Sequence, residues 1–359
     1  MCRASQSQLD HLVYAHRTRS YKVRKAFARF VGDAPIGPFE EEDIVITHGG
    51  QHAIMACLQA LNKKETPKVA IEELSYFGFQ EAVELVNLET ASIGRDSEGP
   101  RLDHFENIAK SGEVSLFLTS SEVHNPTTDT ISRDRRVALA RIAERYEINV
   151  IDDHCHRLNV PEAELFRALL PEQGWIIATP AKSISAALRV GCVIAPRGRS
   201  SELSRAVLQA TYGVSAAIKH VTQFVLSHPE YPRIEDLVSK EIDVYLRTAL
   251  NHLSDTTVKY KPSIPFFWVE LPNTWRTTEF VQAAEKIGVL VDGADNFAVS
   301  GGRSPSAIRI SVNAAFGLEV FENAIEKLAK LLRNPPEKIR VLWVLLYHIF
   351  NYMILNIKL

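Results

Sequence analysis

The chain has 359 residues, of which 46% are hydrophobic and 23% are charged, a balance typical of a soluble globular protein. This length predicts one large and one small domain. A net charge of −2 and a pI near 6.6 argue against a nucleic-acid-binding surface, because such surfaces are basic. The four cysteines lack CxxC spacing and predict neither a disulfide framework nor a zinc site, which suits a reducing cytoplasm. The N-terminus lacks the apolar stretch of a secretory signal.

Short apolar runs alternate with helical patterns between residues 43 and 195. We predict strands at 43–47, 68–71, 114–119, 148–152, 175–179 and 190–195, and helices at 53–61, 76–86 and 133–146. This alternation predicts an α/β fold with a mostly parallel sheet covered on both faces. Beyond residue 230, a long helical stretch and the runs 263–271 and 306–312 predict a smaller α+β unit. We therefore expect an N-terminal segment at 1–42, a large domain at 43–225, a small domain at 226–334 and an apolar tail at 335–359.

Polar residues follow several of these strands, at the edge of the sheet where ligands of such folds bind. Gly49-Gly50-Gln51 comes after strand 43–47 and leads into a helix, whose free N–H groups suit an anion. A plain tight turn is the alternative. Asp152 and Asp153 close strand 148–152 and suggest metal or cation binding, against a solvated strand end or a helix cap.

Two further candidates lie beyond the later strands. His154 and His156, together with the two acids, suggest a zinc or iron site. However, histidines separated by one residue on an extended segment point to opposite faces, so we predict no metal. Lys182 lies just past strand 175–179 among small and hydroxyl residues, where partial desolvation lowers a lysine pKa and makes the amine a nucleophile. An ordinary surface lysine is the alternative.

The candidates recur in a characteristic order along the chain: Gly49-Gly50-Gln51, Tyr76 in LSYFGF, His124-Asn125-Pro126-Thr127-Thr128, Asp153, Thr179 with Lys182 and Arg189, and Arg309 in AIRISV. This order resembles the class I and II aminotransferases of fold type I, over roughly residues 10 to 333. Within them it looks most like the branch of 2-aminoadipate and aromatic aminotransferases and MocR-type regulators. The resemblance implies a mostly parallel seven-stranded sheet between helices, a smaller α+β domain, and pyridoxal 5'-phosphate (PLP) as cofactor.

The resemblance also implies roles for individual residues. Lys182 would form an imine with PLP and carry the Cα proton during catalysis. Arg309, together with Asn125, would bind the substrate carboxylate. Tyr14 would reach the PLP phosphate of a partner subunit, so a homodimer is implied. The implied cofactor contacts are Gly49, Gly50, Gln51, Tyr76, Asn125, Asp153, His156, Thr179, Arg189 and Tyr14.

Three features depart from the family pattern. His156 stands where the family usually has tyrosine. The N-terminal arm ahead of Tyr14 is shortened. The apolar run 341–355 is shorter than the ~20 residues that span a bilayer and is interrupted by polar residues, so we predict an extra tail, such as the product of an altered reading frame, and no membrane association. A membrane anchor or a partner-binding helix is the alternative.

The sequence therefore predicts a PLP-dependent transaminase that moves an amino group between an α-amino acid and a 2-oxo acid. One alternative is a PLP- and effector-binding sensor related to MocR-type regulators. The chain has no basic winged-helix segment, so direct nucleic-acid binding is not expected. Another PLP reaction, such as that of a lyase, is a further alternative, because one fold supports many chemistries.

Overall fold

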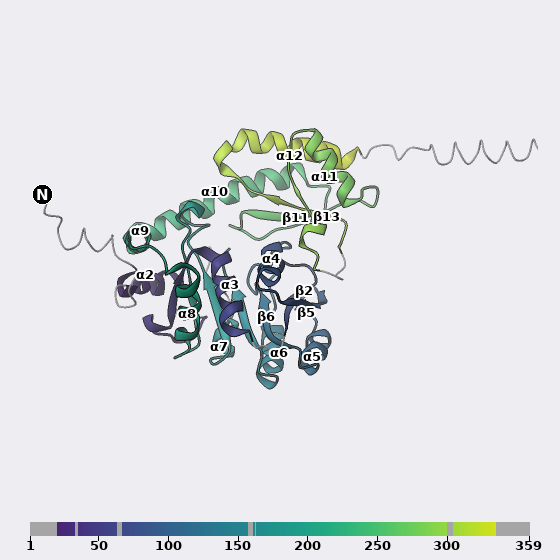
Figure 1. The fold of residues 1–359 in the computed structure, drawn as a ribbon. Helices are drawn as coiled ribbons and strands as arrows, with labels where there is room; N and C mark the ends of the chain where they lie inside the picture. The colour runs from purple at the N-terminus through teal and green to yellow at the C-terminus, as the bar shows by residue number, and fades with distance from the viewer. Residues whose placement is uncertain are drawn as a thin grey trace, which may run out of the picture.

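A computed structural model describes residues 20–32, 35–62, 67–156, 161, 163–299 and 304–334. Tyr14 and the apolar tail at 335–359 lie outside these residues. The purple-to-teal elements surround a central sheet, and the green and yellow elements that follow form a smaller group beside it (Figure 1). The expected division into a large α/β part and a small α+β part agrees with this arrangement, while the domain boundaries stay predictions.

The central sheet has seven strands in the order β1-β9-β8-β7-β6-β2-β3. The neighbouring strands from β8 to β3 pair in parallel, whereas β9 is antiparallel to both of its neighbours. The predicted mostly parallel sheet is therefore confirmed. Its strands are β1 (Ile44–Thr47), β2 (Lys68–Glu72), β3 (Glu89–Ile93), β6 (Val114–Thr119), β7 (Asn149–Asp153), β8 (Gly174–Ala178) and β9 (Gly191–Ile194).

Helices cover both faces of this sheet. They are α2 (Tyr21–Val31), α3 (Gly49–Leu61), α4 (Phe77–Leu85), α5 (Leu102–Lys110), α6 (Arg133–Arg145), α7 (Phe166–Leu169), α8 (Ser200–Thr211) and α9 (Ala216–Leu226). A short hairpin of β4 (Arg95–Asp96) and β5 (Gly99–Pro100) follows β3. Single-turn 3-10 helices occur at Glu41–Asp43 and Ala186–Leu188.

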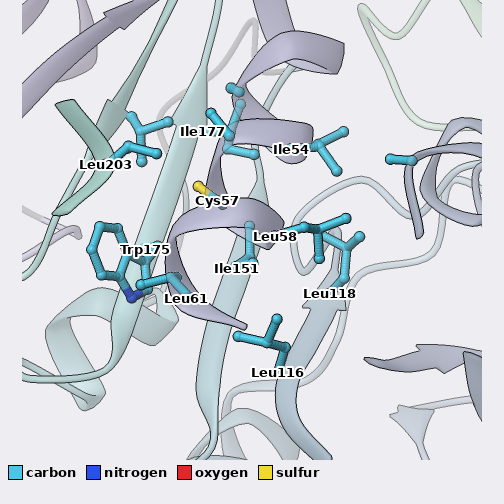
Figure 2. Close-up of a cluster of buried hydrophobic side chains, with 14 of the residues drawn as sticks. Ile54, Cys57, Leu58, Leu61, Leu116, Leu118, Ile151, Trp175, Ile177 and Leu203 are labelled. Carbon is cyan, nitrogen blue, oxygen red and sulfur yellow. The ribbon is translucent and has the colours of Figure 1, made fainter. Parts of the chain in front are cut away.

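Successive side chains of a strand point to opposite faces, so each strand contributes to two cores. On β1, Val45 packs with α3, α4 and α8 on one face, whereas Ile44 and Ile46 pack with α2 and α9 on the other. Burying each such side chain stabilises the fold by about 1.5–3 kcal/mol. Figure 2 shows the core on the face covered by α3, α4 and α8, which includes Ile54, Cys57, Leu58, Leu61, Leu116, Leu118, Ile151, Trp175, Ile177 and Leu203.

The smaller group packs three helices against an antiparallel sheet with the order β10-β11-β13-β12. The predicted runs 263–271 and 306–312 contain its two central strands. Among the described residues, no helix is long and apolar enough to cross a lipid bilayer. The elements are α10 (Tyr231–His252), β10 (Val258–Lys259), β11 (Phe266–Glu270), α11 (Thr277–Lys286), β12 (Asp292–Gly293), β13 (Ala307–Ser311) and α12 (Leu318–Arg333), with 3-10 turns at Ala294–Phe297 and Ala314–Phe316.

The predicted strands between 43 and 195 are all present, and the sequence pattern missed only β3 from the sheet. β3 lies at the sheet edge, and most of its side chains are exposed or half-buried. Its sequence ETASI therefore lacks the continuous apolar run that identifies a strand buried on both faces. The missed strand does not change the predicted fold class.

Candidate active site

A cavity of about 290 Å³ lies at the edge of the sheet where the parallel strands end. Loops after β2, β6, β7 and β8, the start of α3, and strand β13 of the smaller group all line it. It collects the sequence-predicted residues Gly50, Gln51, Tyr76, Asn125, Asp153, His156, Thr179, Lys182, Arg189 and Arg309. Of the remaining predictions, Gly49 lies beside Arg189, and Tyr14 is outside the described residues.

One end of the cavity is suited to an anion. Gly49 begins α3 with a φ of +81°, a conformation that favours glycine. The first N–H groups of a helix have no partner within the helix, so this end can donate to an anion. A β-carbon on Gly49 would lie 3.5 Å from Arg189 Nη2, so this guanidinium is adjacent to the helix start. The Thr179 hydroxyl donates to the Val190 carbonyl at 2.7 Å and accepts from the Ala181 N–H at 3.2 Å. The first bond holds the turn that carries Lys182 against the segment that carries Arg189, and the second lies within the turn.

Lys182 extends from that turn into the cavity, where solvent still reaches its side chain. Partial burial lowers the pKa of its amine, and Arg309 lowers it further, while Cys155 and Asp153 oppose the shift. A lowered pKa increases the fraction of uncharged amine, which is the nucleophilic form. Lys182 is largely exposed to solvent and still lines the cavity, so its role as the reactive lysine stays a prediction.

The adjacent acids Asp152 and Asp153 have different environments because they point to opposite faces of β7. Asp152 is fully buried and accepts hydrogen bonds from the Ser121 N–H and hydroxyl at 2.9 and 2.7 Å. Burial acts to raise its pKa, but His154, 3.1 Å away, and the Ser121 bonds outweigh burial and lower it. Asp153 lines the cavity instead, and burial raises its pKa. Among the residues the structure describes, no group of three or more His, Cys, Asp or Glu side chains could hold a metal ion.

Tyr76 and His156 add rings to the cavity wall. Burial raises the pKa of Tyr76 to about 12, so its hydroxyl stays protonated. The His156 ring contacts the Phe266 ring edge-on at 4.9 Å, and its Nδ1 is buried without a hydrogen-bond partner among the described residues. Burial, followed by the nearby charges of Lys182 and Arg309, lowers the pKa of His156 to about 3. The imidazole is therefore neutral near pH 7 and is available for a hydrogen bond to a ligand.

Arg309 enters the cavity from β13 with its guanidinium held at both terminal nitrogens. Nη1 donates to Asn125 Oδ1 at 2.9 Å, and Nη2 donates to Asp292 Oδ2 at 2.6 Å. The guanidinium also lies 4.8 Å from the centre of the Phe297 ring and 5.6 Å from that of Phe266. Its Nε is buried without a partner within the described part of the chain. A cationic fork with donors still available is the group that binds a carboxylate by paired hydrogen bonds.

Sequence reasoning missed several residues of this site. Cys155 lines the cavity, and burial, followed by Asp153, raises the pKa of its thiol. Its sulfur lies against Gly50, where a β-carbon would be 2.5 Å from Sγ. Ser120 and Phe77 also line the cavity, and Asp292 contacts it through Arg309. Cys155 could have been noted because it stands between two predicted site residues, whereas no local sequence signal marks Asp292.

Comparisons with known proteins agree with the predicted fold. The chain is 28% identical over 310 residues to the uncharacterized HTH-type transcriptional regulator YdeF of Bacillus subtilis, covering 82% of this chain but only 64% of that protein. It is 25% identical to a 2-aminoadipate transaminase of Thermus thermophilus, covering 88% of this chain and 81% of that one.

Solved structures share the fold at low sequence identity. An archaeal alanine:glyoxylate aminotransferase superposes with a TM-score of 0.78 at 24% identity, covering 90% of this chain and 83% of that one. An α-aminoadipate aminotransferase of Thermus thermophilus, solved with N-(5'-phosphopyridoxyl)-L-leucine, gives a TM-score of 0.78 at 20% identity and covers 91% and 85%. The family model for aminotransferase class I and II matches residues 5–328. The chain therefore belongs to the class I and II aminotransferase family, whose members are PLP proteins of fold type I.

Proposed function

We propose that this chain is a PLP-dependent aminotransferase that moves an amino group between an α-amino acid and a 2-oxo acid. The observation that carries the proposal is one cavity in which the amine of Lys182 faces the carboxyl of Asp153 and the guanidinium of Arg309. An amine with a lowered pKa, an acid and a carboxylate-binding arginine are the groups that exchange of an amino group requires.

The residues present fit PLP at each of its polar ends. The helix start at Gly49 and the Arg189 guanidinium suit the phosphate. Asp153 has a buried carboxyl whose pKa is raised, so a cationic ring N–H placed against it would stabilise its charged form. Asn125 and the unpartnered Nδ1 of His156 provide hydrogen-bonding groups for the phenolic oxygen. When bound, PLP supplies an aldehyde that condenses with amines and a ring that withdraws electrons from Cα.

The chain's own residues would then bind the substrate and move its proton. Arg309 would orient the amino acid by its carboxylate, which fixes the position of the Cα–H bond. Lys182, once its amine is released by the incoming amino group, would take the Cα proton and return it elsewhere as a general base and acid. Asp153 would keep the ring nitrogen protonated and so favour loss of that proton. Tyr76, neutral because of its raised pKa, would cover the ring.

A second candidate function is a sensor that binds PLP and an effector without turnover. It is favoured by the similarity to HTH-type transcriptional regulators of Bacillus subtilis, of which this chain spans 64% and 65% in two cases. A lyase reaction is the remaining alternative.

We further propose a homodimer and a cytoplasmic location, both typical of the family. Light scattering coupled to gel filtration would test the dimer.

The test is the visible absorbance of the purified protein with PLP, before and after addition of a panel of amino acids. We expect a band from the lysine-bound cofactor that particular amino acids bleach, with release of the matching 2-oxo acid. Lys182→Ala should lack the band, and Lys240→Ala, at an exposed lysine on α10 paired with Asp236, should keep it. A band that shifts without release of a 2-oxo acid would favour the sensor, and release of ammonia would favour a lyase. If the wild-type protein shows no band, the assignment of Lys182 is wrong.

A further inference from the structure

Asp292 contacts Arg309 but does not line the cavity itself. The two residues are direct partners across β12 and β13, and Asp292 Oδ2 accepts from Arg309 Nη2 at 2.6 Å. The Arg309 side chain is 13% exposed and that of Asp292 is 39% exposed, so the pair lies at the boundary between the cavity wall and solvent. A charge-assisted bond this short restricts rotation of the guanidinium.

The bonds to Arg309 come from two different parts of the fold. Asn125 follows β6 in the large sheet, whereas Asp292 belongs to the small sheet. Because each bond holds a different terminal nitrogen, rotation about the single bonds of the Arg309 side chain would break at least one of them. A guanidinium has five N–H donors, and these two bonds leave the others available, including the buried Nε–H. A substrate carboxylate can therefore bind without displacing Asp292.

We propose that Asp292 is a positioning residue that holds the Arg309 guanidinium in the orientation that receives the substrate carboxylate. The inference rests on the proposed function, in which Arg309 binds that carboxylate. Asp292 also places a negative charge beside Arg309, which weakens the attraction of Arg309 for any anion. Positioning and charge act in opposite directions on carboxylate affinity, so a single substitution cannot separate them.

Two substitutions at this position separate the effects. Asp292→Asn and Asp292→Ala remove the same charge, but only asparagine keeps an oxygen that can accept from Nη2. A positioning role predicts that the alanine variant binds a carboxylate roughly fivefold or more weakly than the asparagine variant, since a hydrogen bond to a charged group is lost. Asp295→Asn is the matched control, because it removes an exposed charge close by in the chain that has no hydrogen bond or ion pair with Arg309 among the described residues.

The experiment measures binding of 3-phenylpropionate, an unreactive carboxylate without an amine, to the PLP-loaded protein by calorimetry. The same variants are then assayed for KM and kcat with the best amino donor. We expect the alanine variant to have the higher Kd and KM of the pair, with Asp295→Asn close to wild type. Equal Kd values for the alanine and asparagine variants would overturn the positioning role. Arg309→Gln serves as the reference: if it binds the probe as tightly as wild type, the proposed carboxylate site is wrong, whereas loss of binding there with equal Asp292 variants refutes only the inference.

Discussion

The contact between Gly50 and Cys155 predicts that Gly50→Ala destabilises the wild-type protein but stabilises a Cys155→Ala variant. Gly50 lies in the first turn of α3 with an ordinary φ, so the backbone accepts alanine. An added β-carbon would, however, lie 2.5 Å from Cys155 Sγ, more than 1 Å inside normal contact. The sulfur cannot rotate away freely, because the thiol is buried and bonds to the Asp153 carboxyl. In the wild-type background, Gly50→Ala should therefore cost about 1–3 kcal/mol of overpacking, offset by about 0.5–1 kcal/mol of helix propensity.

Removing the sulfur reverses the outcome. In a Cys155→Ala background the steric conflict is absent, and Gly50→Ala should stabilise the protein by about 0.5–1 kcal/mol. The coupling energy between the two substitutions should then be about 1–3 kcal/mol. Urea unfolding of the four cofactor-free proteins at pH 7, followed by circular dichroism, measures this cycle. A coupling energy below about 0.5 kcal/mol would show that Sγ moves aside without cost, and the steric reasoning would be wrong.

Two further predictions concern stability. Arg136 is 1% exposed and donates to the Ile131 and Ser121 carbonyls and to the Glu122 carboxylate. In urea unfolding, Arg136→Ala should therefore lose about 3–5 kcal/mol of unfolding free energy, whereas Arg145→Ala, at an exposed arginine, should lose less than about 0.5 kcal/mol. Similar losses for the two variants would contradict the burial argument. The pKa of His156 falls to about 3 in the folded state from a usual 6.5. Below pH 6.5 the unfolded chain therefore binds a proton that the folded chain does not, and the free energy of unfolding falls as the pH is lowered from 6.5 towards 3. Between pH 6.5 and 4 the cofactor-free wild type should lose roughly 2–3 kcal/mol relative to His156→Phe, and parallel pH profiles of the two proteins would refute the shift.

Much of the fold could be predicted because the buried strands are short apolar runs bounded by polar residues. VSLFLT at 114–119 is a complete strand, and all of its residues are buried. The edge strand β3 lacks this signal because solvent covers part of its surface. The collection of Asp153, Lys182 and Gly50 at one cavity follows from the same logic, since parallel strands end at the same edge of a sheet.

The adjacent acids Asp152 and Asp153 show how far strand periodicity alone can assign a site residue. Alternation along a strand places neighbours on opposite faces, so only one of two adjacent acids can face a given cavity. Which of the two does so depends on the faces of Val150 and Ile151, and both are apolar and fully buried. In a strand covered on both sides, hydrophobicity does not identify the cavity face. The family resemblance singles out Asp153, and Asp153 is the acid that lines the cavity.

The pairing of Asp292 with Arg309 shows what local sequence patterns cannot provide. The two residues are separated by a connection that includes a 3-10 turn, and they meet only because β12 and β13 pair antiparallel with Asp292 opposite Arg309. A shift of one residue in this register would place the Asp292 side chain on the other face of the sheet, away from the guanidinium. Ile308 and Ile310 pack into the small core, which favours the observed register because a shift of one residue would expose them. The contact between Asp292 and Arg309 is thus linked to hydrophobic side chains on the opposite face of β13, which pack into the small core.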